Sequence, residues 1–105
     1  PSVFFDLGNA GVKSIYHDRI LVIAKVMKAN PDLKITITGN CDVNGGDNEN
    51  QKLGLRRAEN VKKILVGEFG IDAARLTTDS KGEKEPMASK LNAMNRRVDF
   101  VVDQK

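Results

Sequence analysis

The chain has 105 residues, of which 40% are hydrophobic and 30% are charged. This length and polarity predict one globular domain, residues 1–105, with a single modest core. No apolar run approaches the roughly 20 residues that a membrane-spanning helix needs, and any targeting signal is expected to lie upstream of Pro1 or to have been removed. Seventeen basic and fourteen acidic residues leave a net charge of +3 without a basic block, which predicts a solvated surface.

The first part of the chain predicts a strand, a helix and a second strand. Apolar and polar residues alternate over 3–7 and again over 33–38, as in strands that bury one face. Between them, residues 14–29 carry apolar side chains at steps of three and four, the spacing of an amphipathic helix. Asn30-Pro31 then ends this helix, because the residue before a proline is restricted to extended conformations.

The second part predicts a longer helix and two more strands. The helix is expected over 47–69, with Gly70 just beyond its end. A short strand should follow over 75–80, then a loop over 81–95 and a last strand over 96–102. The order β-α-β-α-β-β with right-handed crossovers predicts an α/β two-layer sandwich, in which both helices cover one face of a mixed sheet.

Arg57 lies inside the apolar arc of the predicted 47–69 helix, about 40° from Leu53 at 100° per residue, whereas Arg56 faces solvent. A guanidinium keeps its charge, so one that faces a packed core needs a partner. Three partners are open at this point: solvent reached by an extended side chain, an internal acid such as Glu68, or an anionic ligand.

Asp42 and a glycine-containing loop precede this helix. Asp42 follows the predicted 33–38 strand, and Gly45 and Gly46 lie in the turn-forming run that leads to Asn50. In α/β folds, ligands bind beyond the carboxyl ends of strands, where a helix start adds free N–H groups. A carboxylate, a guanidinium and N–H groups are therefore expected to converge, unless Asp42 only caps the loop and Asn50 only starts the helix.

The chain shows no pattern for catalysis or metal binding. No Ser-His or Cys-His arrangement and no metal-ligand spacing is visible, and the one histidine, His17, is expected at the surface. Cys41 has no second cysteine to pair with and is interpreted as a small, partly buried residue rather than a reactive thiol. The chain is therefore predicted not to be an enzyme and to carry no cofactor or metal.

The run "GNCDVNGGDNENQKLGLRRAENVKKIL" resembles the signature of the OmpA-like peptidoglycan-binding domain. That signature is a strand ending in Thr-Asp, a Gly-containing loop, Asn, then Leu-Ser-x-x-Arg-Ala-x-x-Val. It is matched in register by Asp42, Gly45, Asn50, Leu53, Arg57, Ala58 and Val61. "VFFDLGNAGV", "KGEKEP" and "NRRVDF" extend the resemblance over nearly the whole chain.

Some positions depart from the family pattern. The family's His-Thr-Asp is Asn40-Cys41-Asp42 here, and Glu49 stands where an aromatic residue is common. Gly54 replaces the serine that follows the motif leucine. Within a helix, this glycine is expected to cost roughly 1 kcal/mol relative to alanine.

The resemblance implies non-covalent binding of peptidoglycan through the diaminopimelate residue of the stem peptide. It assigns the ligand ammonium to Asp42 and the ligand carboxylate to Arg57, which suits a zwitterionic group. Asn50 would add a polar contact, and N–H groups around Gly45 and Gly46 would hold peptide carbonyls. The resemblance also implies a periplasmic location, as part of an outer-membrane or envelope protein.

The resemblance also implies that an arginine of the closing motif, here Arg96 or Arg97, borders the site, unless both are only surface charges beside the end of the strand. Strand alternation sends the two side chains to opposite faces without deciding between them. If a ligand completes Arg57, its replacement by methionine should abolish wall binding at unchanged stability. If an internal acid completes it, the replacement should cost about 3 kcal/mol of stability or more.

A basic α/β module that binds nucleic acid is the alternative function. Such a module needs stacking aromatic side chains beside basic residues on the open face of the sheet, and only Phe4 is available for stacking. No nucleic-acid partner is therefore expected.

Overall fold

Four strands and two long helices make up the described parts of the chain, which are residues 2–6, 8–40, 47–82 and 96–103 of a computed structural model. In chain order the elements are β1 (Ser2–Phe4), η1 (Ser14–Tyr16), α1 (His17–Ala29), β2 (Ile35–Asn40), α2 (Asp47–Gly67), η2 (Ala73–Arg75), β3 (Leu76–Gly82) and β4 (Arg97–Val102). The predicted order of strands and helices is confirmed. Within these ranges, neither helix combines the length and the hydropathy that crossing a bilayer requires.

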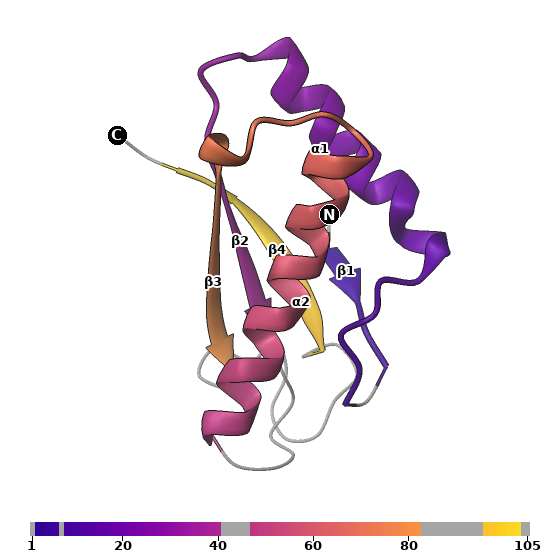
Figure 1. Cartoon of the computed structure of the whole chain (residues 1–105), viewed down its shortest axis with the longest axis vertical. Coiled ribbons are helices and arrows are strands. Elements are labelled where there is room, and N and C mark those ends of the chain that lie inside the picture. Colours follow the sequence, from indigo (N-terminus) through magenta and orange to yellow (C-terminus); the bar gives the residue numbers. More distant parts are fainter. Residues whose placement is uncertain (1, 7, 41–46, 83–95, 104–105) are drawn as a thin grey trace.

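The strands form one mixed sheet in the order β1-β4-β2-β3. β2 and β3 run parallel, as expected for two strands joined by a crossover helix, whereas β4 is antiparallel to both β1 and β2. The last strand of the sequence therefore lies in the middle of the sheet, between the two strands that flank α1. Figure 1 shows that β2 and β3 end on the side of the molecule where α2 begins.

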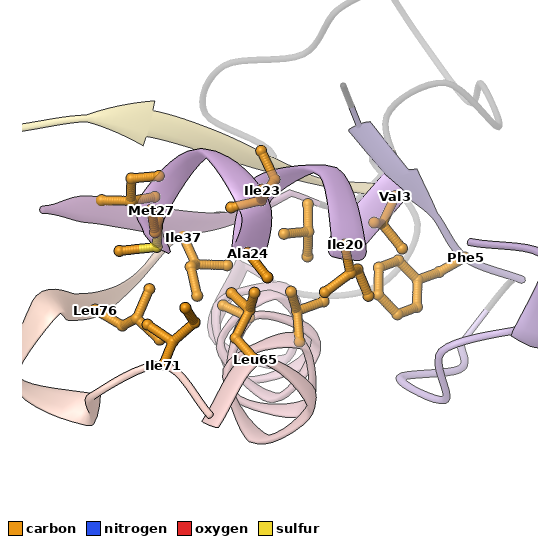
Figure 2. Close-up of a cluster of buried hydrophobic side chains, with 14 residues drawn as sticks. Val3, Phe5, Ile20, Ile23, Ala24, Met27, Ile37, Leu65, Ile71 and Leu76 are labelled. Carbon is orange, nitrogen blue, oxygen red and sulfur yellow. The ribbon is translucent and has the colours of Figure 1, made fainter. Parts of the chain in front are cut away.

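Both helices pack on the same face of the sheet, as predicted (Figures 1 and 2). One cluster of buried side chains joins Ile20, Ile23, Ala24 and Met27 of α1, Ala58, Val61 and Leu65 of α2, and Val3, Ile35, Ile37 and Val98 of the strands. The alternate strand positions, such as Thr36 and Asp99, face the opposite side of the sheet. The period-two and period-3.6 patterns thus meet in a single apolar layer.

The ends of the helices follow local hydrogen-bonding rules. The predicted 14–29 helix begins with the 3₁₀ turn η1 and becomes α-helical at His17. At the other end of α1, Arg75 donates hydrogen bonds to the carbonyls of Met27 and Asn30, which adds side-chain donors to the last turn of the helix. α2 ends at Gly67, and Gly70 adopts a positive φ of 71°, which allows the chain to turn back toward the sheet.

α2 crosses β2 at a pair of glycines. A Cβ atom built on Gly39 would lie 1.8 Å from the carbonyl oxygen of Gly54, and one built on Gly54 would lie 2.4 Å from Oγ of Ser80. The two backbones are therefore closer than any side chain allows. This contact requires Gly54, although a glycine lowers the stability of the isolated helix. The contact also sets how deeply the side chains that follow Gly54 on α2 are buried.

Candidate functional site

The side chain of Arg57 extends from α2 into the region between the segment after β1 and the end of β2. Its guanidinium donates three hydrogen bonds to main-chain carbonyls: Nε to Asn9 at 2.9 Å, Nη1 to Asn40 at 3.0 Å and Nη2 to Asp6 at 3.1 Å. Its Cζ atom lies 5.1 Å from the centre of the Phe5 ring, within the range of a cation–π contact. The residue is completely buried, with an exposed fraction of 0%.

This environment excludes two of the three partners that the sequence left open, namely solvent and Glu68. Arg57 does not reach solvent, so it is not an extended surface side chain. Glu68, the internal acid considered for it, is 53% exposed and lies 3.5 Å from Nδ1 of His17. The three carbonyl oxygens are neutral, so they hold the guanidinium in place without contributing a compensating negative charge.

Asn50 lies two helical turns before Arg57 and therefore on the same face of α2. It is also buried, with 5% of its surface exposed. Asn50 and Arg57 are therefore both buried on one face of α2, the helix that begins on the side of the molecule where β2 ends (Figure 1). Outside the described residues lie Cys41, Asp42, Gly45 and Gly46. The predicted convergence of Asp42 with Arg57 therefore stays a prediction.

Arg96 and Arg97 point to opposite faces, as strand alternation requires. Nε of Arg96 donates to the carbonyl of Phe5 at 3.0 Å, next to the Asp6 carbonyl that accepts from Arg57. Nε of Arg97 instead donates to Oδ2 of Asp99 at 2.8 Å on the face without helices. The structure therefore places Arg96 beside Arg57, and Arg97 away from it.

Lys13 and Asp6 form an ion pair at this corner. The Nζ atom of Lys13 lies 2.7 Å from Oδ1 of Asp6, in a salt bridge whose two side chains are about half exposed. The pKa of Lys13 is raised, first by the hydrogen bond to Asp6 and then by the charge of that carboxylate, while nearby Arg96 acts in the opposite direction. No spacing in the sequence distinguished Lys13 from other surface lysines. Lys13 lies at this corner only because the segment after β1 folds back along the site.

A polar cluster on the other face of the sheet holds the end of β2. Nδ2 of Asn40 lies 3.5 Å from Oδ2 of Asp99, and Asp99 also accepts a hydrogen bond from Ser2 Oγ at 2.7 Å. The main-chain carbonyl of the same Asn40 accepts from Arg57. Asn40 and Asp99 were missed by reasoning from the sequence, although Asn40 stands where the resembled family has histidine.

The chemistry available at this end is recognition of a charged group. Among the residues that the structure describes, no three or more His, Cys, Asp or Glu side chains gather as a metal site would need. The guanidinium of Arg57, bonded to carbonyls, and that of Arg96, bonded to the neighbouring carbonyl, form a pair of cations suited to an anionic group. His17, expected at the surface, is about one-third exposed and packs near Glu68.

Comparisons with known proteins agree with this fold. The chain is 36% identical over 100 residues to the outer membrane protein Omp38 of Acinetobacter baumannii, covering 91% of this chain and 28% of that protein. It is also 36% identical to the outer membrane porin F of Pseudomonas aeruginosa, covering 96% of this chain and 30% of that protein. The chain thus spans less than a third of the length of these relatives.

A solved structure is similar along almost its whole length. The crystal structure of the peptidoglycan-associated lipoprotein from Burkholderia pseudomallei superposes with a TM-score of 0.91 at 33% identity, covering 97% of this chain and 89% of that one. The pattern that defines the OmpA family matches residues 4–98, a range that includes Arg57, Arg96 and every helix described above. The chain belongs to the OmpA family.

Proposed function

We propose that this chain binds cell-wall peptidoglycan without catalysing a reaction, and that residues 1–105 form one such binding domain. The observation that carries the proposal is the buried guanidinium of Arg57, held by three carbonyls at the arginine position of the family signature. The name of the similar Burkholderia pseudomallei protein, a peptidoglycan-associated lipoprotein, supports the same ligand. The domain would then tie an outer-membrane or envelope protein to the wall from the periplasmic side.

The ligand group proposed is the diaminopimelate residue of the stem peptide. Its free amino-acid end carries one ammonium and one carboxylate, for which an aspartate and a forked arginine are the minimal complement. Asp42 would receive the ammonium and Arg57 the carboxylate, with Asn50 adding a polar contact and N–H groups near Gly45 and Gly46 holding peptide carbonyls. Because Arg57 is completely buried, the carboxylate reaches it only if groups that cover it move.

Of the two arginines in the closing motif, Arg96 is the one we assign to the border of this site. Its hydrogen bond to Phe5 places its charge next to that of Arg57, where it favours a ligand carboxylate. Arg97 is 7% exposed and bonded to Asp99 on the other face of the sheet. We therefore propose for Arg97 an indirect role, through the cluster of Asp99 and Asn40 that holds the end of β2.

The test is a pull-down on purified sacculi with Asp42→Asn and a matched control. Asp42→Asn removes the charge that meets the ammonium while keeping side-chain size, so the affinity should fall by about 2 kcal/mol, roughly thirtyfold. Asp32→Asn makes the same change in charge at an exposed turn at the opposite end of β2 and should bind like the parent. If Asp42 only caps its loop, the variant will lose melting temperature but bind sacculi normally once corrected for the folded fraction.

A further inference from the structure

Two of the three carbonyls that hold Arg57 lie on one edge of its guanidinium. On this edge Nε donates to the carbonyl of Asn9 at 2.9 Å and Nη2 donates to that of Asp6 at 3.1 Å. Nη1, outside this edge, donates to the carbonyl of Asn40 at 3.0 Å. The N–H groups of Nε and Nη2 are parallel, and with such a pair an arginine binds both oxygens of a carboxylate. Here the two oxygens come instead from the main chain after β1.

A turn presents both carbonyls to the guanidinium. The N–H of Asn9 donates to the carbonyl of Asp6 at 3.1 Å, and Gly8 between them has a φ of 68°, a conformation that favours glycine. From α2, Nδ2 of Asn60 donates to the carbonyl of Ala10 at 2.8 Å. The hydrogen bond within the turn and the one from α2 therefore both hold the main chain where its carbonyls reach the guanidinium.

A carboxylate is a stronger partner for this edge than two neutral carbonyls are. It accepts the same two hydrogen bonds and adds a negative charge, which shortens and strengthens both of them. Asp6 and Asn9 are exposed residues, so water can bond their carbonyls once these leave the guanidinium. The Nε–Nη2 edge of the buried Arg57 is therefore open to a ligand carboxylate only when the two carbonyls move away.

We propose that the main chain after β1 is an internal competitor of the ligand: the carbonyls of Asp6 and Asn9 occupy the place of the ligand carboxylate, which displaces them on binding. The inference rests on the proposed function and deepens it, because it states how access to the same site is controlled. Only molecules whose carbonyls have moved are competent to bind, and the measured affinity falls in proportion to their fraction. A change that strains or loosens the closed turn should therefore strengthen binding.

Gly8→Ala strains the closed turn without disturbing a neighbour. A Cβ atom is disfavoured at a φ of 68°, and nothing lies within 4 Å of the position it would take. Opening of the turn relieves this strain, so the 105-residue variant should bind a soluble diaminopimelate stem peptide about fivefold more tightly than the parent in isothermal titration calorimetry. Gly70→Ala is the matched control, since Gly70 has a φ of 71° and equally open surroundings beyond the end of α2. It should lose similar stability and keep the parent affinity.

Asn60→Ala loosens the same segment from the side of α2. The variant loses the hydrogen bond to the carbonyl of Ala10, so it should also bind the stem peptide more tightly than the parent, by roughly threefold to tenfold. Asn30→Ala is the matched control. Nδ2 of Asn30 donates to a main-chain carbonyl, that of Val26, at the same distance of 2.8 Å, but at the end of α1 and away from Arg57. This control should bind like the parent.

Carbonyl-carbon NMR signals observe the displacement itself. The signals of Asp6 and Asn9 should shift when the stem peptide is added to the parent protein, because both carbonyls lose their hydrogen bonds from the guanidinium. The carbonyl of Ser2 is the control, since it accepts from Nη1 of another arginine, Arg19, at 2.7 Å. Its signal should stay unchanged.

The outcomes separate the inference from the function on which it rests. If Gly8→Ala and Asn60→Ala bind the peptide like the parent or more weakly, after correction for the folded fraction, displacement is overturned and peptidoglycan binding stays intact. An equal gain for Gly70→Ala, or unchanged signals of Asp6 and Asn9 in a parent protein that binds, would overturn it in the same way. A parent that binds neither the peptide nor sacculi would overturn the proposed function and the internal competitor together.

Discussion

Arg57 is at once a structural and a candidate binding residue, because its guanidinium joins α2 to two other segments of the chain. Its acceptors belong to Asp6 and Asn9 after β1 and to Asn40 at the end of β2. The sequence showed that this arginine faces the core and must be paired. It could not show the partners, because main-chain carbonyls are present at every position and leave no mark in a sequence pattern.

These hydrogen bonds replace the unchanged stability that was expected of Arg57→Met if a ligand alone completes Arg57. Methionine cannot bond the three carbonyls, so we expect a loss of about 2–4 kcal/mol in the free energy of unfolding, together with loss of sacculus binding. Urea denaturation measures the first effect, and a pull-down corrected for the folded fraction measures the second. Arg56→Met, at an exposed position of the same helix, should change neither.

Arg57→Lys separates the effect of the positive charge from that of the planar guanidinium donors. Lysine keeps the positive charge but not the planar donors that reach three acceptors, so its stability should lie between those of the parent and Arg57→Met. Its binding should be weakened substantially in the same assay. A folded Arg57→Lys or Arg57→Met variant that binds sacculi like the parent would show that Arg57 is purely structural and that the ligand binds elsewhere.

Among the elements, the packing of α2 on β2 depends on Gly39 and Gly54, although helix propensity makes Gly54 unfavourable within α2. Periodicity predicted α2 and β2 to within a few residues, since their apolar faces repeat regularly. It could not show how closely they approach, because that distance depends on residues from separate parts of the sequence. For the same reason, the order β1-β4-β2-β3 across the sheet was not predicted, whereas the order along the chain was.

Alanine substitutions at three glycines test this packing. In an open helix, Gly→Ala should gain up to about 1 kcal/mol, and Gly67→Ala should do so because nothing lies within 4 Å of the added Cβ. Gly54→Ala should instead lose about 1–2 kcal/mol net, since its Cβ would lie 2.4 Å from Ser80 Oγ and 3.0 Å from the Gly39 carbonyl oxygen. Gly39→Ala should be the most damaging of the three, because its Cβ would meet the backbone of Gly54 at 1.8 Å.

Thermal melts of the three variants measure this order directly. Equal melting temperatures for Gly54→Ala and Gly67→Ala would mean that α2 can move away from β2 at no cost. In that case, the contact would not fix the depth of Arg57.

At the scale of the whole molecule, the Arg57 site lies toward the end of the sheet where β2 ends. This asymmetry follows from the topology: β2 and β3 are parallel and end together, and α2 begins where β2 ends (Figure 1). The resemblance to the family motif predicted the site at this end.

Ligand binding at this end should stabilise the entire fold, since a ligand that binds only the folded chain shifts the unfolding equilibrium. With free diaminopimelate stem peptide at ten times its Kd, the gain is about 1.4 kcal/mol. For a domain of this size, we expect a rise in Tm of roughly 6–11 °C. A peptide with lysine in place of diaminopimelate has no carboxylate at its side-chain end, so at the same concentration it should leave Tm almost unchanged.

Two comparisons identify the source of such a rise. Asp42→Asn should lose it and Asp32→Asn should keep it, because only the first removes the carboxylate assigned to the ligand ammonium. Repeating the melts in 0.5 M salt separates a specific site from general attraction to the net charge of +3. Attraction between exposed charges is largely screened at that ionic strength, whereas a buried guanidinium paired with a carboxylate is screened much less. A rise in Tm that disappears in salt, or that the lysine peptide reproduces, would contradict recognition of diaminopimelate by Asp42 and Arg57.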